Sequence, residues 1–447
     1  MRPATDCNKR VVCIVDAMAE LQKIATAIEF SEMKTFGDVA NYVVKGIIGR
    51  LEFAHEVHFV FDRYDGDPRK SPKILEQLKR SGFGAHEYTN LHPTRTLPPW
   101  KKVVANNQTK ALLTDFLSLY FERYRNLIPV GKFVFFGGGY TDRQLTRVVS
   151  SDVVRRESTL SCDHTEADTR IIVHAVSRSR VRQSTVFVES PDTDVFILLL
   201  GHYRSMACGT DVWFHTGVGD ERRFIPIHCL DNALMRKDPL LSKALFPMHA
   251  LTGCDTNSSL YYVTKETSLK GLLATPSADL ELLIQLPTLQ SASVQAATRF
   301  IARLYDPKMK FAPKHSDINA LRAQLAFSTN KTIEKLPPSE PALLQFITRG
   351  AWQTDVWLNA GKQFYTPKDP TEMGWCLKKD SLQPVFFKGQ TSMQFLSDYF
   401  CNCNRRKKCK ENCTCGDIGC CELCSCDGKC SKSDNSDELC DDENDDI

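Results

Sequence analysis

The sequence predicts an α/β fold, in which a mainly parallel sheet is covered by helices on both faces, and three observations carry this prediction. Three apolar runs that favour β-structure end in acidic residues and precede helix-like stretches, at residues 11–16, 57–62 and 185–194. Two further runs, residues 132–139 and 211–216, have the composition of additional strands. Apolar strands separated by helical lengths are typical of a parallel sheet that is buried on both sides.

Acidic residues follow three of these strands at one predicted edge of the sheet. Asp16 and Asp62 end the first two runs, and Asp192 and Asp194 follow the third. In open α/β sheets, ligands gather outside the carboxyl ends of the strands. A turn that ends the third strand and caps the next helix would explain one of the last two aspartates. It explains both less well, because Asp194 opens the apolar run VFILLL, where an unpaired carboxylate costs several kcal/mol.

Residues 161–176 (SCDHTEADTRIIVHAV) predict a helix with two acidic residues at its start. Asp163 and Glu166 have the spacing of a capping box. On a regular helix, Glu166 and Asp168 point about 200° apart, so they converge only at the first turn, where the helix dipole favours negative charge. Helix capping explains one of these carboxylates but not both.

Residues 248–259 (MHALTGCDTNSS) contribute one more carboxylate, Asp255, in a Gly-Cys-Asp sequence that is by itself typical of a turn. Two unpaired carboxylates about 4 Å apart repel by about 4 kcal/mol at an effective dielectric constant near 20. Bound cations would relieve this repulsion, and oxygen ligands without histidine or cysteine favour Mg²⁺ or Mn²⁺. The predicted ligands of two such ions are Asp16, Asp62, Glu166, Asp168, Asp192, Asp194 and Asp255.

A basic segment lies between the second and third acidic strands. Residues 63–160 contain 17 Lys and Arg against 9 Asp and Glu, and within them residues 111–124 have the pattern of an amphipathic helix. We expect this segment to be an insertion that forms a basic wall over the acidic sheet edge and attracts a polyanion.

The ordered motifs VDAMA, FDRY, TEADT, SPDTD and HALTGCDT resemble the flap endonuclease branch of the PIN-like nucleases over roughly residues 10–270. The resemblance implies a PIN-like domain over residues 1–275, in which the seven carboxylates are catalytic and hold two Mg²⁺ or Mn²⁺ ions. It implies hydrolysis of phosphodiester bonds in DNA or RNA. Residues 67–80 are similar to the family's basic helix that draws in the scissile phosphate, so Lys70 and Arg80 are candidate substrate-binding residues. A solvated helix face is the alternative.

The sequence departs from this family after Asp255. The flap endonucleases continue with a glycine-rich motif that grips duplex backbone, whereas this chain continues TNSSLYYVTKETSLK without those glycines. A second hypothesis is therefore a catalytically inactive nucleic-acid-binding or scaffold protein that retains the fold.

The end of the chain predicts a zinc cluster. Eleven of the 18 cysteines lie in residues 401–447, and in a reducing compartment crowded cysteines are metal ligands more often than disulfides. Residues 399–431 resemble the CXC motif of tesmin-like proteins, which implies about three Zn²⁺ ions bound by nine cysteines. These are Cys401, Cys403, Cys409, Cys413, Cys415, Cys421, Cys424, Cys426 and Cys430. The acidic residues 432–447 have the composition of a disordered tail.

The remaining sequence sets broader expectations. Residues 276–398 predict a mainly helical support region, with helix-like residues 292–305 and proline-rich connections. The 447 residues include 42% hydrophobic and 25% charged residues, with a formal net charge of +3. No run approaches the roughly 18 uncharged apolar residues of a membrane span, and no signal peptide precedes the first apolar run. We expect a nuclear or cytoplasmic protein whose partner is nucleic acid and not a membrane.

Overall fold

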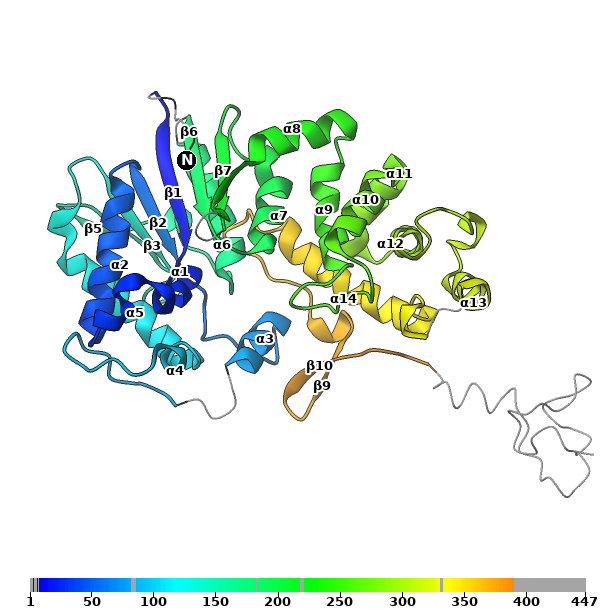
Figure 1. Cartoon of the computed structure of the whole chain (residues 1–447), viewed down its shortest axis with the longest axis horizontal. Helices are drawn as coiled ribbons and strands as arrows, with labels where there is room; N and C mark the ends of the chain where they lie inside the picture. The colour runs from blue at the N-terminus through cyan, green and yellow to red at the C-terminus, as the bar shows by residue number, and fades with distance from the viewer. Residues whose placement is uncertain are drawn as a thin grey trace, which may run out of the picture. The chain divides into compact units, whose positions relative to one another are not determined.

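The centre of the fold is an eight-stranded sheet, which the computed structural model shows in the order β5-β4-β3-β2-β1-β6-β7-β8 (Figure 1). The structure describes residues 3, 6, 8–81, 86–181, 183–217, 221–329 and 333–389. Residues 1–386 form one compact unit, and the residues after them form a second. The strands of the sheet are β1 (Arg10–Asp16), β2 (Glu56–Val60), β3 (Phe133–Gly137), β4 (Thr146–Val149), β5 (Val154–Arg156), β6 (Ser184–Glu189), β7 (Asp211–Thr216) and β8 (Arg223–Pro226).

The five central strands, β3, β2, β1, β6 and β7, run parallel to one another. They are the five strands that the sequence predicts, so the mostly parallel α/β class is confirmed. Antiparallel strands continue the sheet at both ends, β4 and β5 beside β3 and β8 beside β7. The sequence pattern does not predict these three, because each is at most four residues long and contains arginine.

Helices cover both faces of the sheet, because alternate side chains of β1 point into two different cores. Val12 and Ile14 pack in the core that includes α6 and α7, whereas Val11, Cys13 and Val15 pack in the core that includes α1, α2 and α5. The helices before and around the sheet are α1 (Ala17–Lys23), α2 (Phe36–Leu51), α3 (Pro72–Arg80), α4 (Trp100–Val103), α5 (Asn107–Arg123), α6 (Ala167–Ser179), α7 (Thr193–His202) and α8 (Ile227–Lys237).

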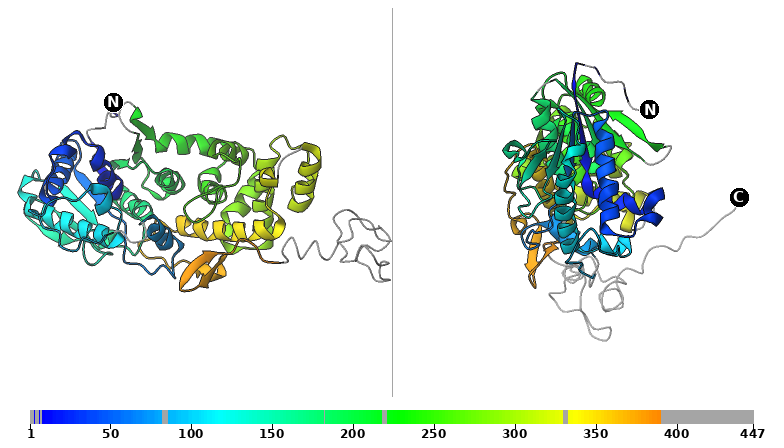
Figure 2. Two further views of the ribbon diagram at one scale, coloured as in Figure 1. Left: turned by 60° about the horizontal axis from the view of Figure 1, so that its bottom comes forward. Right: turned by 90° about the vertical axis from the view of Figure 1, so that its left-hand side faces the viewer.

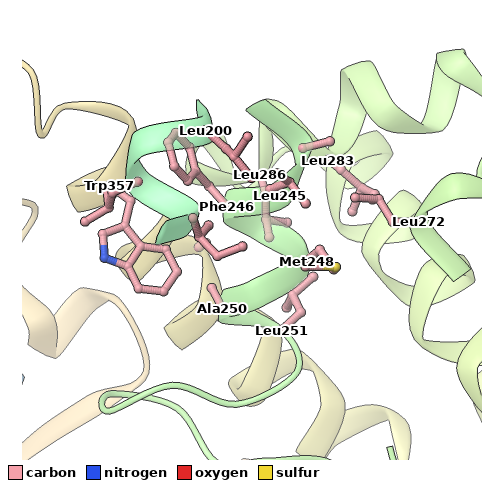
Figure 3. Packing of buried hydrophobic residues seen from close by; sticks show 14 of the residues in the cluster. Leu200, Leu245, Phe246, Met248, Ala250, Leu251, Leu272, Leu283, Leu286 and Trp357 are labelled. Carbon is pink, nitrogen blue, oxygen red and sulfur yellow. The ribbon is translucent and has the colours of Figure 1, made fainter. Parts of the chain in front are cut away.

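The later helices extend from one side of the sheet (Figures 1 and 2). They are α9 (Leu241–Ala250), α10 (Lys265–Leu273), α11 (Ser277–Ile284), α12 (Ser291–Tyr305), α13 (Ile318–Thr329) and α14 (Glu340–Leu358), followed by a hairpin of β9 (Trp375–Lys378) and β10 (Ser381–Pro384). Their core is continuous with that of α7: Leu200 of α7, Phe246 of α9 and Trp357 of α14 belong to one buried cluster (Figure 3).

One connecting segment predicted in this region is wrong in part. Residues 335–346 have the prolines of a connection, but Glu340 begins α14, which at 19 residues is the longest helix in the described part of the chain. Pro341 lies in the first turn of α14, where its missing N–H group leaves no intrahelical hydrogen bond unmade. The predicted helices at residues 111–124 and 292–305 correspond to α5 and α12.

The basic residues 63–160 do not form a separate wall over the sheet. They supply β3, β4 and β5 as well as α3, α4 and α5. The sheet therefore includes much of the segment that the charge pattern marks as an insertion. The predicted zinc motif at residues 399–431 and the acidic residues 432–447 lie outside the described residues.

None of the helices that the structure describes is long and apolar enough to span a bilayer.

Candidate functional site

The candidate site lies where the strand order of the parallel sheet reverses. From β1 the chain proceeds outward to β2 and β3, and it returns at β6, on the other side of β1. In open α/β sheets this switch point leaves a crevice at the carboxyl ends of the strands. Asp16 is the last residue of β1, and Ser190 follows the last residue of β6. The two side chains meet there, since the Ser190 hydroxyl donates to Asp16 Oδ2 over 3.2 Å.

Asp16 is a buried carboxylate that accepts few hydrogen bonds. Its Oδ1 accepts a hydrogen bond of 3.0 Å from the Ala19 amide and so caps α1. Burial, together with the negative charges of Asp62 and Asp192, raises the pKa of Asp16 to about 7. A carboxyl group with this pKa gains little from its protein surroundings when it ionises, so Asp16 is suited to a cation that arrives from outside.

Asp62 connects the end of β2 to the start of α6. It lies two residues beyond β2 and accepts a 2.7 Å hydrogen bond from the Ala167 amide. The Tyr64 hydroxyl donates to its other oxygen over 3.1 Å. Burial and the Asp62 charge raise the pKa of Tyr64 well above its ordinary value, so Tyr64 remains a donor.

Asp192 and Asp194 have different roles at the start of α7. Asp192 is the N-cap and accepts a 2.8 Å hydrogen bond from the Asp194 amide, as the capping interpretation predicts. Burial and the neighbouring Asp194 raise the pKa of Asp192. Asp194 instead has a buried partner, since His249 Nε2 of α9 lies 2.7 Å from its Oδ1. Burial alone would raise the pKa of Asp194, but this hydrogen bond and the charge of Lys73 lower it.

Glu166 and Asp168 do converge at the first turn of α6, although the predicted capping box is wrong. Glu166 is the N-cap residue, but its side chain makes no capping hydrogen bond, and Asp163 lies outside the helix. The Glu166 side chain instead lies 2.8 Å from Lys73 Nζ. Burial raises the pKa of Glu166 to about 7 even though Lys73 lowers it, and Asp255 adds to the rise. Burial, Glu166 and Asp192 raise the pKa of Asp168 well above its ordinary value.

Asp255 is presented by a tight turn after α9. Cys254 and Asn257 exchange two backbone hydrogen bonds of 3.0 and 3.1 Å, which close the turn around Asp255. Gly253 has a φ of +106°, and a Cβ atom there would lie 2.7 Å from the Ser259 Cα atom. The turn therefore needs glycine, and it places Asp255 in ion pairs with Lys73 at 3.5 Å and with Arg80.

Helix α3 supplies the basic side chains of the site, but not as the sequence predicts. Ser71 caps the helix, so Lys70 lies in the preceding turn with an exposed side chain, and Arg80 is in the last turn. The sequence interpretation missed Lys73, which is almost completely buried between Glu166 and Asp255. Burial alone would lower the pKa of Lys73, but the surrounding carboxylates raise it well above its ordinary value. Helical periodicity carries a signal for this residue, because positions 73 and 80 are seven apart and share one face.

A pocket of about 140 Å³ opens beside Glu166. Lys70 and Lys73 line it from the α3 side, and Trp352 and Tyr365 contribute aromatic walls from α14 and the segment after it. A solvent-connected space thus reaches the buried end of the acidic cluster.

The seven predicted carboxylates form one electrostatic cluster, because the charges of Asp62, Asp192, Asp194 and Asp255 all influence the pKa values of their neighbours. The cluster is not a preformed ligand set: among the described residues, no group of three or more His, Cys, Asp or Glu side chains could hold a metal ion as it stands. Lys73 and His249 each contact one oxygen of Glu166 and Asp194, at 2.8 and 2.7 Å.

Neither the models of known protein families nor the curated proteins include a match to this chain. The site is therefore defined by its own chemistry, as an acidic cluster at the switch point of a mostly parallel α/β sheet.

Proposed function

We propose that the protein is a divalent-metal-dependent nuclease that hydrolyses phosphodiester bonds of DNA or RNA, with a PIN-like, flap endonuclease-type fold. One observation carries the proposal: β1, β2, α6, α7 and the 254–258 turn direct seven carboxylates into one cluster in which burial and mutual repulsion raise several pKa values. Carboxylates with perturbed pKa values in a cleft are typical of functional sites and are rare on solvated surfaces.

The donor set suits Mg²⁺ or Mn²⁺ in type and charge. All seven side chains offer carboxylate oxygens, and the raised pKa values of Asp16 and Asp192 show that the protein leaves their charge poorly compensated. Asp16, Asp168 and Asp192 would hold a first ion. The remaining carboxylates of the cluster are Asp62, Glu166, Asp194 and Asp255. Two divalent ions supply an activated water and stabilise the leaving oxygen of an in-line phosphoryl displacement.

The chain's own cations would orient the substrate. Arg80 is paired with Asp255 but has an exposed side chain, so its guanidinium is accessible to a phosphate that approaches the cluster. Lys70 lines the pocket beside Glu166 and is exposed. Tyr64 and Ser190 hold Asp62 and Asp16 in place through their hydroxyl groups.

The test is a cleavage assay with purified full-length protein on single-stranded, flap and hairpin oligonucleotides of DNA and RNA, in Mg²⁺, in Mn²⁺ and in EDTA. We expect metal-dependent cleavage of at least one substrate, lost in the Asp192→Ala, Asp194→Ala double variant. A matched control, Glu87→Ala with Asp152→Ala, removes two exposed carboxylates outside the cluster and keeps activity.

A second function, nucleic-acid binding without turnover, is favoured by one feature. Lys73 forms an ion pair with Glu166 inside the cluster, and a lysine there can take the place of a metal ion. Wild-type protein that binds these oligonucleotides but cuts none of them in either metal would favour this function over the first.

The proposal includes the end of the chain. About three Zn²⁺ ions held by the nine cysteines of residues 399–431 would stabilise a small module with affinity for nucleic acid. An intracellular location, nuclear or cytoplasmic, belongs to the same proposal, since both the thiolates and the substrate require it.

A further inference from the structure

A second pocket, of about 280 Å³, also borders Asp255. It lies among α3, the 254–258 turn, α14 and the β9–β10 hairpin, and Asp255 itself is part of its wall. The residues that matter for its chemistry are Lys79, Asn257, Arg349, Trp375 and Phe386. Glu76 also lines the pocket, but it is ion-paired with Lys79 at 2.6 Å. The pocket thus adjoins the acidic cluster but adds an arginine, an amide and aromatic groups.

Arg349 gives this pocket a buried positive charge. Its side chain is 3% exposed, its Nε donates to Asn257 Oδ1 over 3.4 Å, and its Nη1 donates to the Val385 carbonyl. Among the described residues, no Asp or Glu lies within ion-pair distance of this guanidinium. Burial therefore lowers the pKa of Arg349 to about 10, which still leaves it protonated at neutral pH.

A buried guanidinium without a carboxylate partner is costly unless an anion approaches it. Within the described part of the chain, the Arg349 guanidinium contacts an amide oxygen, a backbone carbonyl and an aromatic ring, none of which carries a negative charge. A guanidinium binds phosphate oxygens in a bidentate manner and is more weakly hydrated than a lysine ammonium. Arg349 is consequently equipped to hold a phosphate group at the inner end of the pocket.

Phe386 provides an aromatic surface at the same place. Its side chain is 62% exposed, and its ring lies 5.5 Å from the Arg349 guanidinium carbon. Trp375 forms part of the pocket wall and is itself fixed against Trp352 at a centroid distance of 5.5 Å. A rigid aromatic wall with an exposed phenylalanine beside an arginine is the combination with which proteins stack an unpaired base and hold its phosphate.

Building on the proposed nuclease function, we propose that this pocket binds the nucleotide next to the scissile phosphate of a single-stranded substrate, with Phe386 stacked on its base and Arg349 bound to its phosphate. Only an unpaired base can enter the pocket, because duplex stacking would keep its faces covered. In this proposal, Asp255 belongs to the catalytic cluster, and the pocket beside it recognises the single strand.

The test uses the full-length protein in EDTA, so that binding is measured without cleavage. The probes are fluorescein-labelled 12-nucleotide single strands of DNA in which one base at a time is replaced by an abasic site. For the wild type, we expect one abasic position to weaken binding roughly five- to a hundredfold, the range that base–aromatic stacking spans. For Phe386→Ala, the intact strand should bind with the same loss, and that abasic position should cost nothing further.

Leu377→Ala is the matched control, because Leu377 is 49% exposed on the same hairpin but does not line the pocket. It should bind every probe as the wild type does. If Phe386→Ala binds all probes as the wild type does, or if its loss is independent of the abasic position, the base-binding pocket is disproved. That result leaves the nuclease proposal intact when wild-type cleavage is present, whereas wild-type protein that neither binds nor cuts any oligonucleotide overturns both.

Arg349 has a separate readout. Arg349→Met keeps the volume and loses the charge, so it should flatten the slope of log affinity against log salt by about 0.7, as expected for one single-strand phosphate contact. Arg349→Lys should keep the slope but weaken binding, because an ammonium does not form the bidentate contact. Urea unfolding of each variant verifies that it is folded, and an unchanged slope in folded Arg349→Met would show that Arg349 contacts no phosphate.

Discussion

Two groups of buried charge lie at the carboxyl ends of the neighbouring strands β6 and β1, and the protein neutralises them very differently. Glu189, the last residue of β6, accepts hydrogen bonds of 3.0 and 2.7 Å from Arg50. Burial opposes its ionisation, but His215 and Arg50 lower the pKa of Glu189 to about 2. On the other face of the sheet, Asp16 has a pKa raised to about 7.

The difference shows which charged groups the protein neutralises with its own side chains. Arg50 has its donors satisfied by Glu189, Glu20 and the Gly46 carbonyl, so this group is a closed ion-pair network. The acidic cluster has seven carboxylates, and the cations that ion-pair with it within the described residues are Lys73 and Arg80, while His249 contributes a hydrogen bond to Asp194. An excess of buried negative charge persists where a ligand supplies the missing positive charge.

The strongest test of the comparison removes charge from the acidic cluster. The Asp192→Ala, Asp194→Ala double variant should lose cleavage by at least about a thousandfold, or ~4 kcal/mol of barrier. In EDTA it should remain folded, but its free energy of unfolding should fall by about 1–3 kcal/mol, because loss of the Asp192 cap and of the Asp194–His249 hydrogen bond outweighs the relieved repulsion between like charges. Cleavage rates and urea titrations measure the two effects. Undiminished cleavage by a double variant purified free of contaminating nuclease would remove these residues from the active site.

The closed network lies outside the seven carboxylates, and its loss should appear in stability. Arg50→Ala leaves Glu189 buried without its cation, and breaking a buried pair in this way costs about 3 kcal/mol of unfolding free energy. This stability depends on an acid with a lowered pKa, so it should be present above about pH 4.5 and be lost as the pH falls toward about 2. Urea unfolding at pH 7 and pH 3 measures this, and a loss of equal size at both pH values would contradict the assignment.

The pH dependence of stability sharpens the contrast in the metal-free protein. The raised pKa values of Asp16 and Glu166 mean that the unfolded chain releases these protons first as the pH rises. In EDTA, the free energy of unfolding should therefore decrease between about pH 4 and pH 8, by several kcal/mol. Above about pH 8 both groups are ionised and the effect is constant.

Mn²⁺ should reverse this loss, because carboxylates bind metal only when they are deprotonated. The rise in unfolding midpoint on addition of MnCl₂ should consequently be larger at pH 8 than at pH 5.5. Equal midpoints at pH 5.5 and pH 8 in EDTA, with no response to Mn²⁺, would show that the seven carboxylates do not repel one another in the folded protein.

The sequence predicted the parts of this site that follow from strand ends and from motif order. All five parallel strands and the positions of Asp16, Asp62 and Asp192 at or just after their ends follow from local apolar runs, which need no tertiary information. The partners of the carboxylates could not be predicted in the same way. His249 reaches Asp194 across 55 residues, from a helix whose packing against α7 is set by the shared core.

Lys73 shows a second limit of sequence patterns. A lysine in the run SPKILEQLKR resembles any solvated residue, and its burial depends on Glu166 and Asp255, which are 93 and 182 positions away in the chain. The short antiparallel strands β4, β5 and β8 escaped prediction because their pairing with longer strands stabilises them, whereas their own composition does not.

The smallest expected effect concerns the basic side chains that reach solvent. Lys70 is exposed beside the pocket of Glu166, and Arg80 is paired with Asp255 at the exposed end of α3. Each contact that either makes with a phosphate contributes a slope of about 0.7–0.9 in log affinity against log salt. Replacement of both by Ala should flatten the salt dependence of oligonucleotide binding by about one to two units and slow cleavage.

Affinity for Mn²⁺ should not fall in this variant, since neither side chain is a metal ligand. Lys101→Ala with Lys102→Ala is the matched control: it removes the same charge from exposed positions in α4 and should leave the slope and the rate as in the wild type. The single variants separate the two residues further, because loss of Arg80 also removes one of the ion pairs of Asp255 and loss of Lys70 does not. A salt slope and a cleavage rate untouched by the double replacement would mean that Lys70 and Arg80 belong to a solvated surface and that the substrate reaches the carboxylates along another path.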